Sequence, residues 1–350
     1  MNNRDVLESM SPQTVQAMRQ SLYQSRNQSS PLYRALAQVI LEDATELDLS
    51  GYGLTEVPEA VRGLTRLRQL WLDDNEITEL PDWLGELNHL SALNLANNRL
   101  TRLPDGLQHL PTLHGLNLQG NLGLELPDWL WSLPLRHLNL ALLGVQHVPD
   151  PLVGLTHLTH LNLNLNEIWL LPDWLGELRQ LEHLDLSDLD LMELPGAIGL
   201  LPELYFLNLS GNQLTALPEP LGQLRNLGIL RLENNRLSTF PSCITRLEGL
   251  IELKLGNNHL GEVPAAIAGL TQLEELDLSD NPKLALPDTM GELQRLEQLD
   301  LSGSNLTRVP KSLLDLECEI HLPLGWPTLS NGKVPQEAIE LQVKHGDLKG

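Results

Sequence analysis

The chain has 350 residues, with 23 Lys and Arg against 46 Asp and Glu, which gives a formal net charge of -23. Such an excess of acid repels phosphate backbones and anionic bilayers, so we expect no nucleic-acid partner. Two cysteines, Cys243 and Cys318, are too few for a disulfide framework. The sequence also has no run of 18 uncharged apolar residues, so we expect no membrane insertion. These features favour a cytoplasmic protein.

Residues 1–42 are predicted to form a helical N-terminal cap. Ser11 with Pro12 can begin a helix over 11–24, and Ser30 with Pro31 a second helix over 30–42, each with apolar residues at helical spacing. The first part, residues 1–30, is also rich in Ser, Gln and Asn, which is typical of a flexible leader. That composition resembles bacterial proteins injected into host cells, and this alternative stays open.

An internal repeat dominates the rest of the chain. Each unit begins with an LxL pair, and ten of the eleven spacings between the pairs are 23 residues; the exception, from Leu116 to Leu138, is 22. A proline stands eleven positions after the first Leu of every unit, from Pro58 to Pro310. The first leucines are Leu47, Leu70, Leu93, Leu116, Leu138, Leu161, Leu184, Leu207, Leu230, Leu253, Leu276 and Leu299.

The pattern within one unit predicts a short strand, a turn and a return segment. Alternation in xLxLx places two leucines on one face of a strand, and stacking of parallel strands about 4.8 Å apart would bury them. Proline has no N–H to donate, so it ends the sheet and begins an irregular or 3₁₀ segment. An Asn five positions after the first Leu can bond to the backbone of adjoining turns. This structural ladder comprises Asn75, Asn98, Asn121, Asn166, Asn212, Asn235, Asn258 and Asn281.

The consensus LxxLxLxxNxLxxLPxxLGxL resembles the leucine-rich repeat family, in particular the LP-type 23-residue repeats of bacterial proteins, Scribble-like scaffolds and plant Ras-group-related proteins. The resemblance implies an α/β repeat solenoid, a curved right-handed horseshoe with parallel strands on its concave face and 3₁₀ or irregular segments on its convex face. The expected organisation is a cap over 1–42, twelve repeats over 43–316, and a C-terminal cap over 317–350, with a strand-like run through Ile320 and a short helix near 335–343.

No catalytic signature is present. The sequence contains no phosphate-binding GxxxxGK[ST] loop, no GxGxxG after a strand, no HExxH and no GxSxG. Glu317 and Glu319 would raise the pKa of the Cys318 thiol and make it a poor nucleophile. We therefore expect a protein that is not an enzyme. A ligase or hydrolase with an unrecognised C-terminal site remains an alternative.

Function is then expected on the concave sheet. The residues beside the first strand leucine project from that face. In the third to sixth repeats these positions carry no acid, whereas acids gather at both ends of the array. Exposed aromatic, aliphatic and Arg side chains surrounded by a charged rim are typical of protein-binding patches. The predicted site comprises His137, His160, His183, Tyr205, Phe206, Ile229 and Arg231, with Trp169 on an adjoining loop and Leu142 and Leu165 on the same face.

The three stacked histidines predict no metal site, because side chains on neighbouring parallel strands point the same way and do not converge. We expect no cofactor. The sequence therefore predicts a monomeric, acidic scaffold that binds a protein or peptide partner, one that carries positive charge. The alternative keeps the fold and makes the chain a bacterial effector, secreted into a host cell without a cleaved signal peptide, whose repeats recognise a host protein.

Overall fold

The computed structural model describes residues 45–306 and 308–323. They form two units: unit 1 holds residues 45–145 and 149–166, and unit 2 holds residues 146–148, 167–306 and 308–323. The N-terminal cap or leader predicted within residues 1–42, and the helix predicted near 335–343, lie outside the described residues. Of the segment predicted as a C-terminal cap, the structure describes only residues 317–323, and these include one strand.

Unit 1 contains six parallel strands, each three residues long, that are hydrogen-bonded in sequence order. The strands are β1 (Glu46–Asp48), β2 (Gln69–Trp71), β3 (Ala92–Asn94), β4 (Gly115–Asn117), β5 (His137–Asn139) and β6 (His160–Asn162). The connecting 3₁₀ helices are η1 (Glu59–Gly63), η2 (Asp82–Glu86), η3 (Asp105–His109), η4 (Asp128–Ser132) and η5 (Asp150–Gly154).

Unit 2 repeats this arrangement with seven parallel strands. They are β7 (His183–Asp185), β8 (Phe206–Asn208), β9 (Ile229–Arg231), β10 (Glu252–Lys254), β11 (Glu275–Asp277), β12 (Gln298–Asp300) and β13 (Glu319–His321). The 3₁₀ helices are η6 (Asp173–Glu177), η7 (Gly196–Leu200), η8 (Glu219–Gln223), η9 (Ser242–Arg246), η10 (Ala265–Gly269), η11 (Asp288–Glu292) and η12 (Lys311–Asp315).

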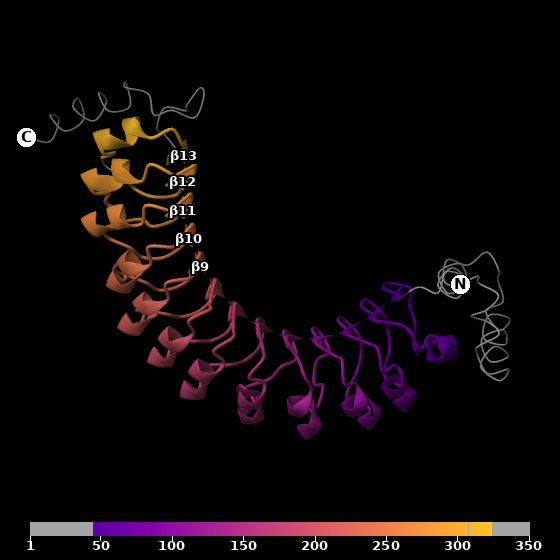
Figure 1. The fold of residues 1–350 in the computed structure, drawn as a ribbon. Helices are drawn as coiled ribbons and strands as arrows, with labels where there is room; N and C mark the ends of the chain where they lie inside the picture. The colour runs from indigo at the N-terminus through magenta and orange to yellow at the C-terminus, as the bar shows by residue number, and fades with distance from the viewer. Residues whose placement is uncertain (1–44, 307, 324–350) are drawn as a thin grey trace, which may run out of the picture. The chain divides into compact units, whose positions relative to one another are not determined.

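The alternating leucines form the core in both units. In β2 and β3 the paired Leu70 and Leu93 are each 1% exposed, whereas the flanking positions of these strands are half-buried. Each 3₁₀ helix follows directly on a proline in an extended conformation, as at Pro81 (φ -77, ψ 143) before η2. Figure 1 shows the strands on the concave side of each unit and the 3₁₀ helices on the opposite side. The predicted solenoid of short strands and 3₁₀ turns is therefore confirmed.

The eight asparagines bind backbone groups of two neighbouring repeats. Asn235 is typical: its Nδ2 donates to the carbonyl oxygens of Leu209 (2.9 Å) and Leu232 (3.1 Å), and its Oδ1 accepts from the N–H of Leu214 (3.0 Å). All eight are buried and donate in the same way to one carbonyl of the preceding repeat and one of their own. Buried backbone carbonyls require hydrogen-bond donors, and each Asn amide supplies donors to the carbonyls of the turns.

Leu143 occupies one of the four repeat positions that lack this Asn, and there the backbone takes over part of the amide's role. The N–H of Gly123 donates to the carbonyl oxygen of Leu143 over 2.9 Å, while the Leu143 side chain is 2% exposed. An apolar side chain therefore fills the space of the amide without leaving the N–H of Gly123 unpaired.

A second repeated position, four residues after the first Leu, adopts a left-handed backbone, which the sequence pattern did not reveal. Its φ is positive in all twelve repeats and ranges from 51° to 72°. Ten of the twelve residues are Gly, Asn or Asp, the types that tolerate this conformation. The other two are Leu142 (φ 52°) and Leu165 (φ 55°), both in unit 1.

These two leucines gain little from burial to offset the strained backbone. Leu142 is 41% exposed and Leu165 is 45% exposed. A left-handed backbone costs an ordinary L-residue about 1–2 kcal/mol. Because Asn occupies the same position at Asn97 and Asn257, the fold itself does not require Leu there.

Replacing Asn235 with Ala should destabilise the protein by about 2–4 kcal/mol, because the buried N–H of Leu214 loses its acceptor and two carbonyls each lose one of their donors. The measurement is the free energy of unfolding in urea. Gln223→Ala, at the exposed end of η8, is the control and should change this energy by less than about 0.5 kcal/mol. An Asn235→Ala protein as stable as the control would refute the structural role of the ladder.

The double replacement Leu142→Asn with Leu165→Asn should stabilise the protein by about 1–2 kcal/mol, because Asn adopts the left-handed turn at lower cost. The reverse change, Asn257→Leu, should destabilise it by a similar amount per site. Thermal unfolding of the three proteins at one pH measures both effects. A lower melting temperature for the double variant would show that the two leucines are held by contacts that outweigh the backbone strain.

Candidate protein-binding surface

In unit 1 the predicted site residues form a neutral patch. His137 at the start of β5 is exposed and His160 at the start of β6 is half-buried, with ring centroids 4.4 Å apart and an interplanar angle of 70°. Thr159 Oγ1 lies 2.9 Å from His160 Nδ1. The exposed Leu142 and Leu165 follow these strands in the same two repeats. This patch offers imidazole edges and aliphatic groups without a carboxylate on β5 or β6.

In unit 2 the predicted residues form a stack of rings that ends on a guanidinium. The ring of His183 on β7 stacks with Phe206 on β8, with centroids 5.8 Å apart and an interplanar angle of 22°. The Cζ atom of Arg231 on β9 lies 5.5 Å from the centroid of the Phe206 ring, within cation–π range. Tyr205 contacts His183 with centroids 6.3 Å apart. Four of the predicted site residues are thus brought together by three neighbouring strands.

Tyr205 extends this stack towards β9 because of a glycine that sequence analysis passed over. A Cβ atom at Gly228 would lie 2.3 Å from Tyr205 Cε2, so a larger residue at this position would displace the ring from where it lies. Tyr205 is nevertheless 40% exposed, and Ile229, the residue after Gly228, is half-buried. The stack therefore keeps an aromatic and an aliphatic group open to solvent.

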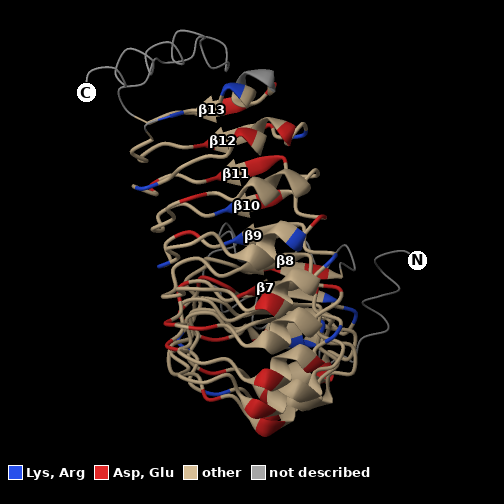
Figure 2. Ribbon diagram, turned by 90° about the vertical axis from the view of Figure 1, so that its left-hand side faces the viewer, with Lys and Arg blue, Asp and Glu red and all other residues tan. Residues whose placement is uncertain are grey.

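The cations on the same face are already paired with carboxylates. Arg231 Nε donates to Glu252 Oε1 over 2.8 Å, and Lys254 Nζ donates to Glu275 Oε2 over 2.8 Å. The hydrogen bond to Glu252 raises the pKa of Arg231. Burial lowers the pKa of Lys254, but the bond and the charge of Glu275 outweigh it, so that the net shift is upward. Figure 2 shows how charged residues recur along these strands of unit 2.

Two further carboxylates on this face, Glu233 and Asp277, form no ion pair at contact distance with a cation of the described residues. Glu233 Oε2 is inaccessible to solvent and accepts no hydrogen bond from the described residues. Burial and, to a lesser degree, the charge of Asp277 raise the pKa of Glu233, against opposing effects of its own backbone N–H, Arg231 and Lys254. A Cβ at Gly256 would lie 2.9 Å from Asp277 Oδ2, so Gly256 is what permits Asp277 to lean over this part of the face. The sequence alone did not single out Glu233; its only signal was an acid directly after the second strand leucine of the ninth repeat.

Trp169 lies in the loop after β6 and is exposed. Its ring contacts His147, with centroids 6.2 Å apart and an interplanar angle of 71°. No described ring contact joins it to Tyr205 or Phe206. The structure therefore places Trp169 on a loop surface of unit 2, beside His147, and not within the aromatic stack.

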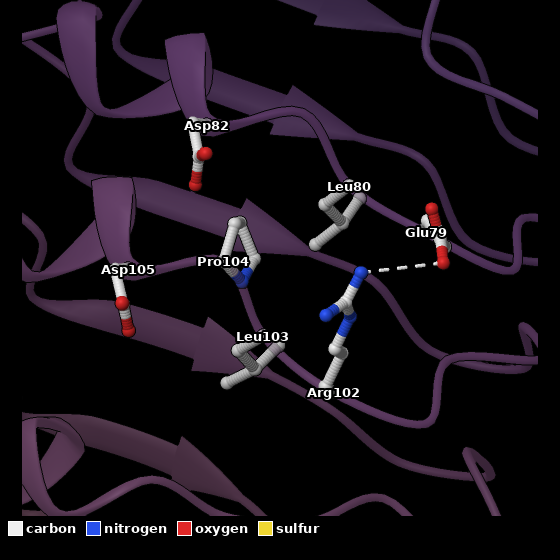
Figure 3. A pocket seen from close by; sticks show the side chains of 7 residues that line it. All are labelled: Glu79, Leu80, Asp82, Arg102, Leu103, Pro104 and Asp105. Atoms are coloured by element: carbon white, nitrogen blue, oxygen red, sulfur yellow. Dashed lines mark hydrogen bonds and ion pairs between the residues drawn. The ribbon is translucent and has the colours of Figure 1, made fainter.

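A pocket in unit 1 lies apart from the predicted site residues (Figure 3). In its lining, Arg102 Nη2 lies 3.4 Å from Glu79 Oε1, and both side chains are largely exposed. The pocket has three carboxylates and one cation in its lining, which comprises Glu79, Leu80, Asp82, Arg102, Leu103, Pro104 and Asp105. Exposed ion pairs of this kind contribute little to binding or stability.

The two cysteines are buried and free. Burial, more than any other cause, raises the pKa of Cys243 to about 11 and that of Cys318 to about 11. Both side chains are thus protonated thiols at neutral pH, and a thiol is a poor nucleophile. Within residues 45–306 and 308–323, no helix has the length and apolar character that crossing a membrane requires.

Comparisons with known proteins agree with this fold. A model of the leucine-rich repeat region matches residues 195–285, and a leucine rich repeat model matches residues 42–100 and 65–122. A search of curated protein sequences found no match. Among solved structures, an LRR protein of Leptospira interrogans is 33% identical, with a TM-score of 0.73, and the match covers 85% of this chain and 81% of that protein.

Two further structures are similar in fold. An internalin of Listeria monocytogenes is 23% identical, covers 81% of this chain and 84% of its own, and has a TM-score of 0.67. The Arabidopsis receptor kinase HAESA, solved in complex with the peptide hormone IDA and the co-receptor SERK1, is 25% identical, with a TM-score of 0.64, covering 80% of this chain and 54% of its own. With its repeats, its stacked strands and these matches, the chain belongs to the leucine-rich repeat family.

Proposed function

We propose that this chain is a non-catalytic scaffold that binds a protein or peptide partner on the concave sheet surface of unit 2. The observation that carries the proposal is the partly exposed stack of His183, Phe206 and Arg231 with Tyr205 beside it. Tyr, Phe and Arg are the residue types that contribute most to protein interfaces when water is excluded from them. The His183–Phe206 ring contact and the Arg231–Glu252 ion pair hold these side chains in place before a partner binds. This pre-organisation lowers the entropic cost of binding.

The strands beneath the stack add a second reason. Short strands fixed by leucines on one side and by their neighbours along the sheet lose little freedom when a partner binds. HAESA, which shares the fold, was solved with a peptide hormone. That likeness supports a protein or peptide ligand for this chain.

The unit 1 patch contributes a weaker argument for the same function. Leu142 and Leu165 are exposed and adopt backbone conformations that Leu disfavours. Strained residues are retained where something other than fold stability selects them. We include them, with His137 and His160, as a candidate second contact surface.

The proposal extends to the setting in which the chain acts. Both cysteines are free thiols, which fits a reducing compartment such as the cytoplasm. The net charge of -23 steers a partner with positive charge towards the chain and disfavours self-association, so we propose that it acts as a monomer.

Phe206→Arg should weaken partner binding by more than about 1 kcal/mol, or about fivefold, because a second cation beside Arg231 breaks the stack. The test is affinity capture from the native cell lysate, with quantitative mass spectrometry of the bound proteins. Leu200→Arg is the matched control, since Leu200 is an apolar residue on η7 that is 48% exposed on the opposite side of unit 2.

A protein captured by the wild type and by Leu200→Arg, but lost with Phe206→Arg, would support the proposal. Equal capture by all three proteins would place binding elsewhere. A large fall in melting temperature for Phe206→Arg would instead show that Phe206 supports the core, and Tyr205→Ala would then replace it in the assay.

A further inference from the structure

The apolar stack and the unpaired carboxylates occupy neighbouring strands of the same face. Phe206 and Ile229 lie on β8 and β9, whereas Glu233 follows β9 and Asp277 ends β11. In that region the two cations, Arg231 and Lys254, are each engaged by a carboxylate of the following strand. The face therefore changes from aromatic and aliphatic to acidic over a few strands.

Glu233 and Asp277 form no ion pair with a described cation, although the charges of Arg231 and Lys254 act on Glu233. Glu233 Oε2 is inaccessible to solvent and has no hydrogen-bond donor among the described residues. Asp277 Oδ1 accepts from the N–H of Ser279 over 2.9 Å, while its Oδ2 is the oxygen that leans over Gly256. A buried carboxylate without enough donors is unfavourable, so a donor cation from outside would relieve the cost.

The strands that follow strengthen the acidic character of this side. Asp300 on β12 and Glu319 on β13 share a single partner, His321, whose ring nitrogens lie 3.6 Å and 3.0 Å from their carboxylates. The hydrogen bond to Glu319, more than any other cause, raises the pKa of His321. Even with His321 protonated, the acids of β10 to β13 outnumber the cations.

We propose that this face binds an extended partner segment in which an aromatic or large aliphatic residue lies about three residues from a Lys or Arg. The apolar residue packs on Tyr205, Phe206 and Ile229, and the cation lies between Glu233 and Asp277. The inference rests on the proposed function and specifies the chemistry of its partner.

The spacing follows from the geometry of the sheet. Neighbouring strands lie about 4.8 Å apart, so β9 and β11 are separated by about 10 Å. A segment that crosses the strands in an extended conformation advances about 3.3 Å per residue. About three residues therefore span the distance from Ile229 on β9 to Asp277 on β11, in either chain direction.

The test uses a phage-displayed library of random 12-residue peptides, selected on the full chain at pH 7. We expect enriched peptides to carry Phe, Tyr, Trp, Leu or Ile about three positions from Lys or Arg. Peptides selected in the same way on the double variant Glu233→Gln with Asp277→Asn should still be enriched in the apolar residue but no longer in Lys or Arg. Glu233→Gln alone is the second variant, for use if the double variant does not fold.

The affinities of a synthetic peptide with the enriched consensus and of its Lys→Met counterpart then give the coupling energy between the peptide Lys and the carboxylates of Glu233 and Asp277. The wild type should bind the Lys peptide about tenfold more tightly, and Glu233→Gln with Asp277→Asn should bind the two peptides equally. An unchanged Lys preference in that variant, or a library without the paired motif, would overturn the inference and leave the proposed function standing. Peptides that bind Phe206→Arg as tightly as the wild type and Leu200→Arg would overturn the proposed function itself.

Discussion

The structure depends on one constraint: a three-residue strand can satisfy its backbone groups only through the neighbouring repeats. In a long helix the bonds lie within one segment, whereas here the N–H of Leu232 donates to the carbonyl of Lys254 and the N–H of Leu209 to that of Arg231, one repeat further along the chain. The Asn amides apply the same rule to the turns. Any change of repeat length must therefore be absorbed locally. In the shortened repeat before Leu138, Leu133 after η4 is extended (φ -70, ψ 150) and its carbonyl accepts from the N–H of Leu135 over 2.8 Å.

This constraint leaves the concave side chains free to vary. The buried face of each strand holds leucine, and most turns hold Asn, Gly or Asp. The two outward positions of a strand contribute little to the packing of one repeat on the next. Selection for a partner can act there without disturbing the fold. In unit 2 these positions carry the ring stack and the paired and unpaired charges, so the chemistry of the surface is a property of this chain and not of its fold.

The repeat unit was predictable because its leucines and prolines recur at fixed spacing, and the eight asparagines could be assigned for the same reason. The left-handed turn was missed, although Gly, Asn and Asp fill that position in ten repeats, because the position shows no single consensus letter. Which outward residues come together was predicted only in part. His183, Tyr205, Phe206 and Arg231 meet on neighbouring strands, whereas Trp169 contacts His147 on a loop. The lack of a hydrogen-bond partner at Glu233 Oε2 depends on atomic packing, which no periodicity encodes.

The most direct test of the account is site-specific photo-crosslinking in the native lysate. The photoreactive residue p-benzoylphenylalanine would replace Tyr205 on the concave face of unit 2 in one protein, and Leu200 on η7 in the other. The account predicts that a partner protein becomes covalently attached through position 205 and not through position 200. Attachment through position 200 alone, or with equal yield at both positions, would contradict the assignment of the binding surface to the concave sheet.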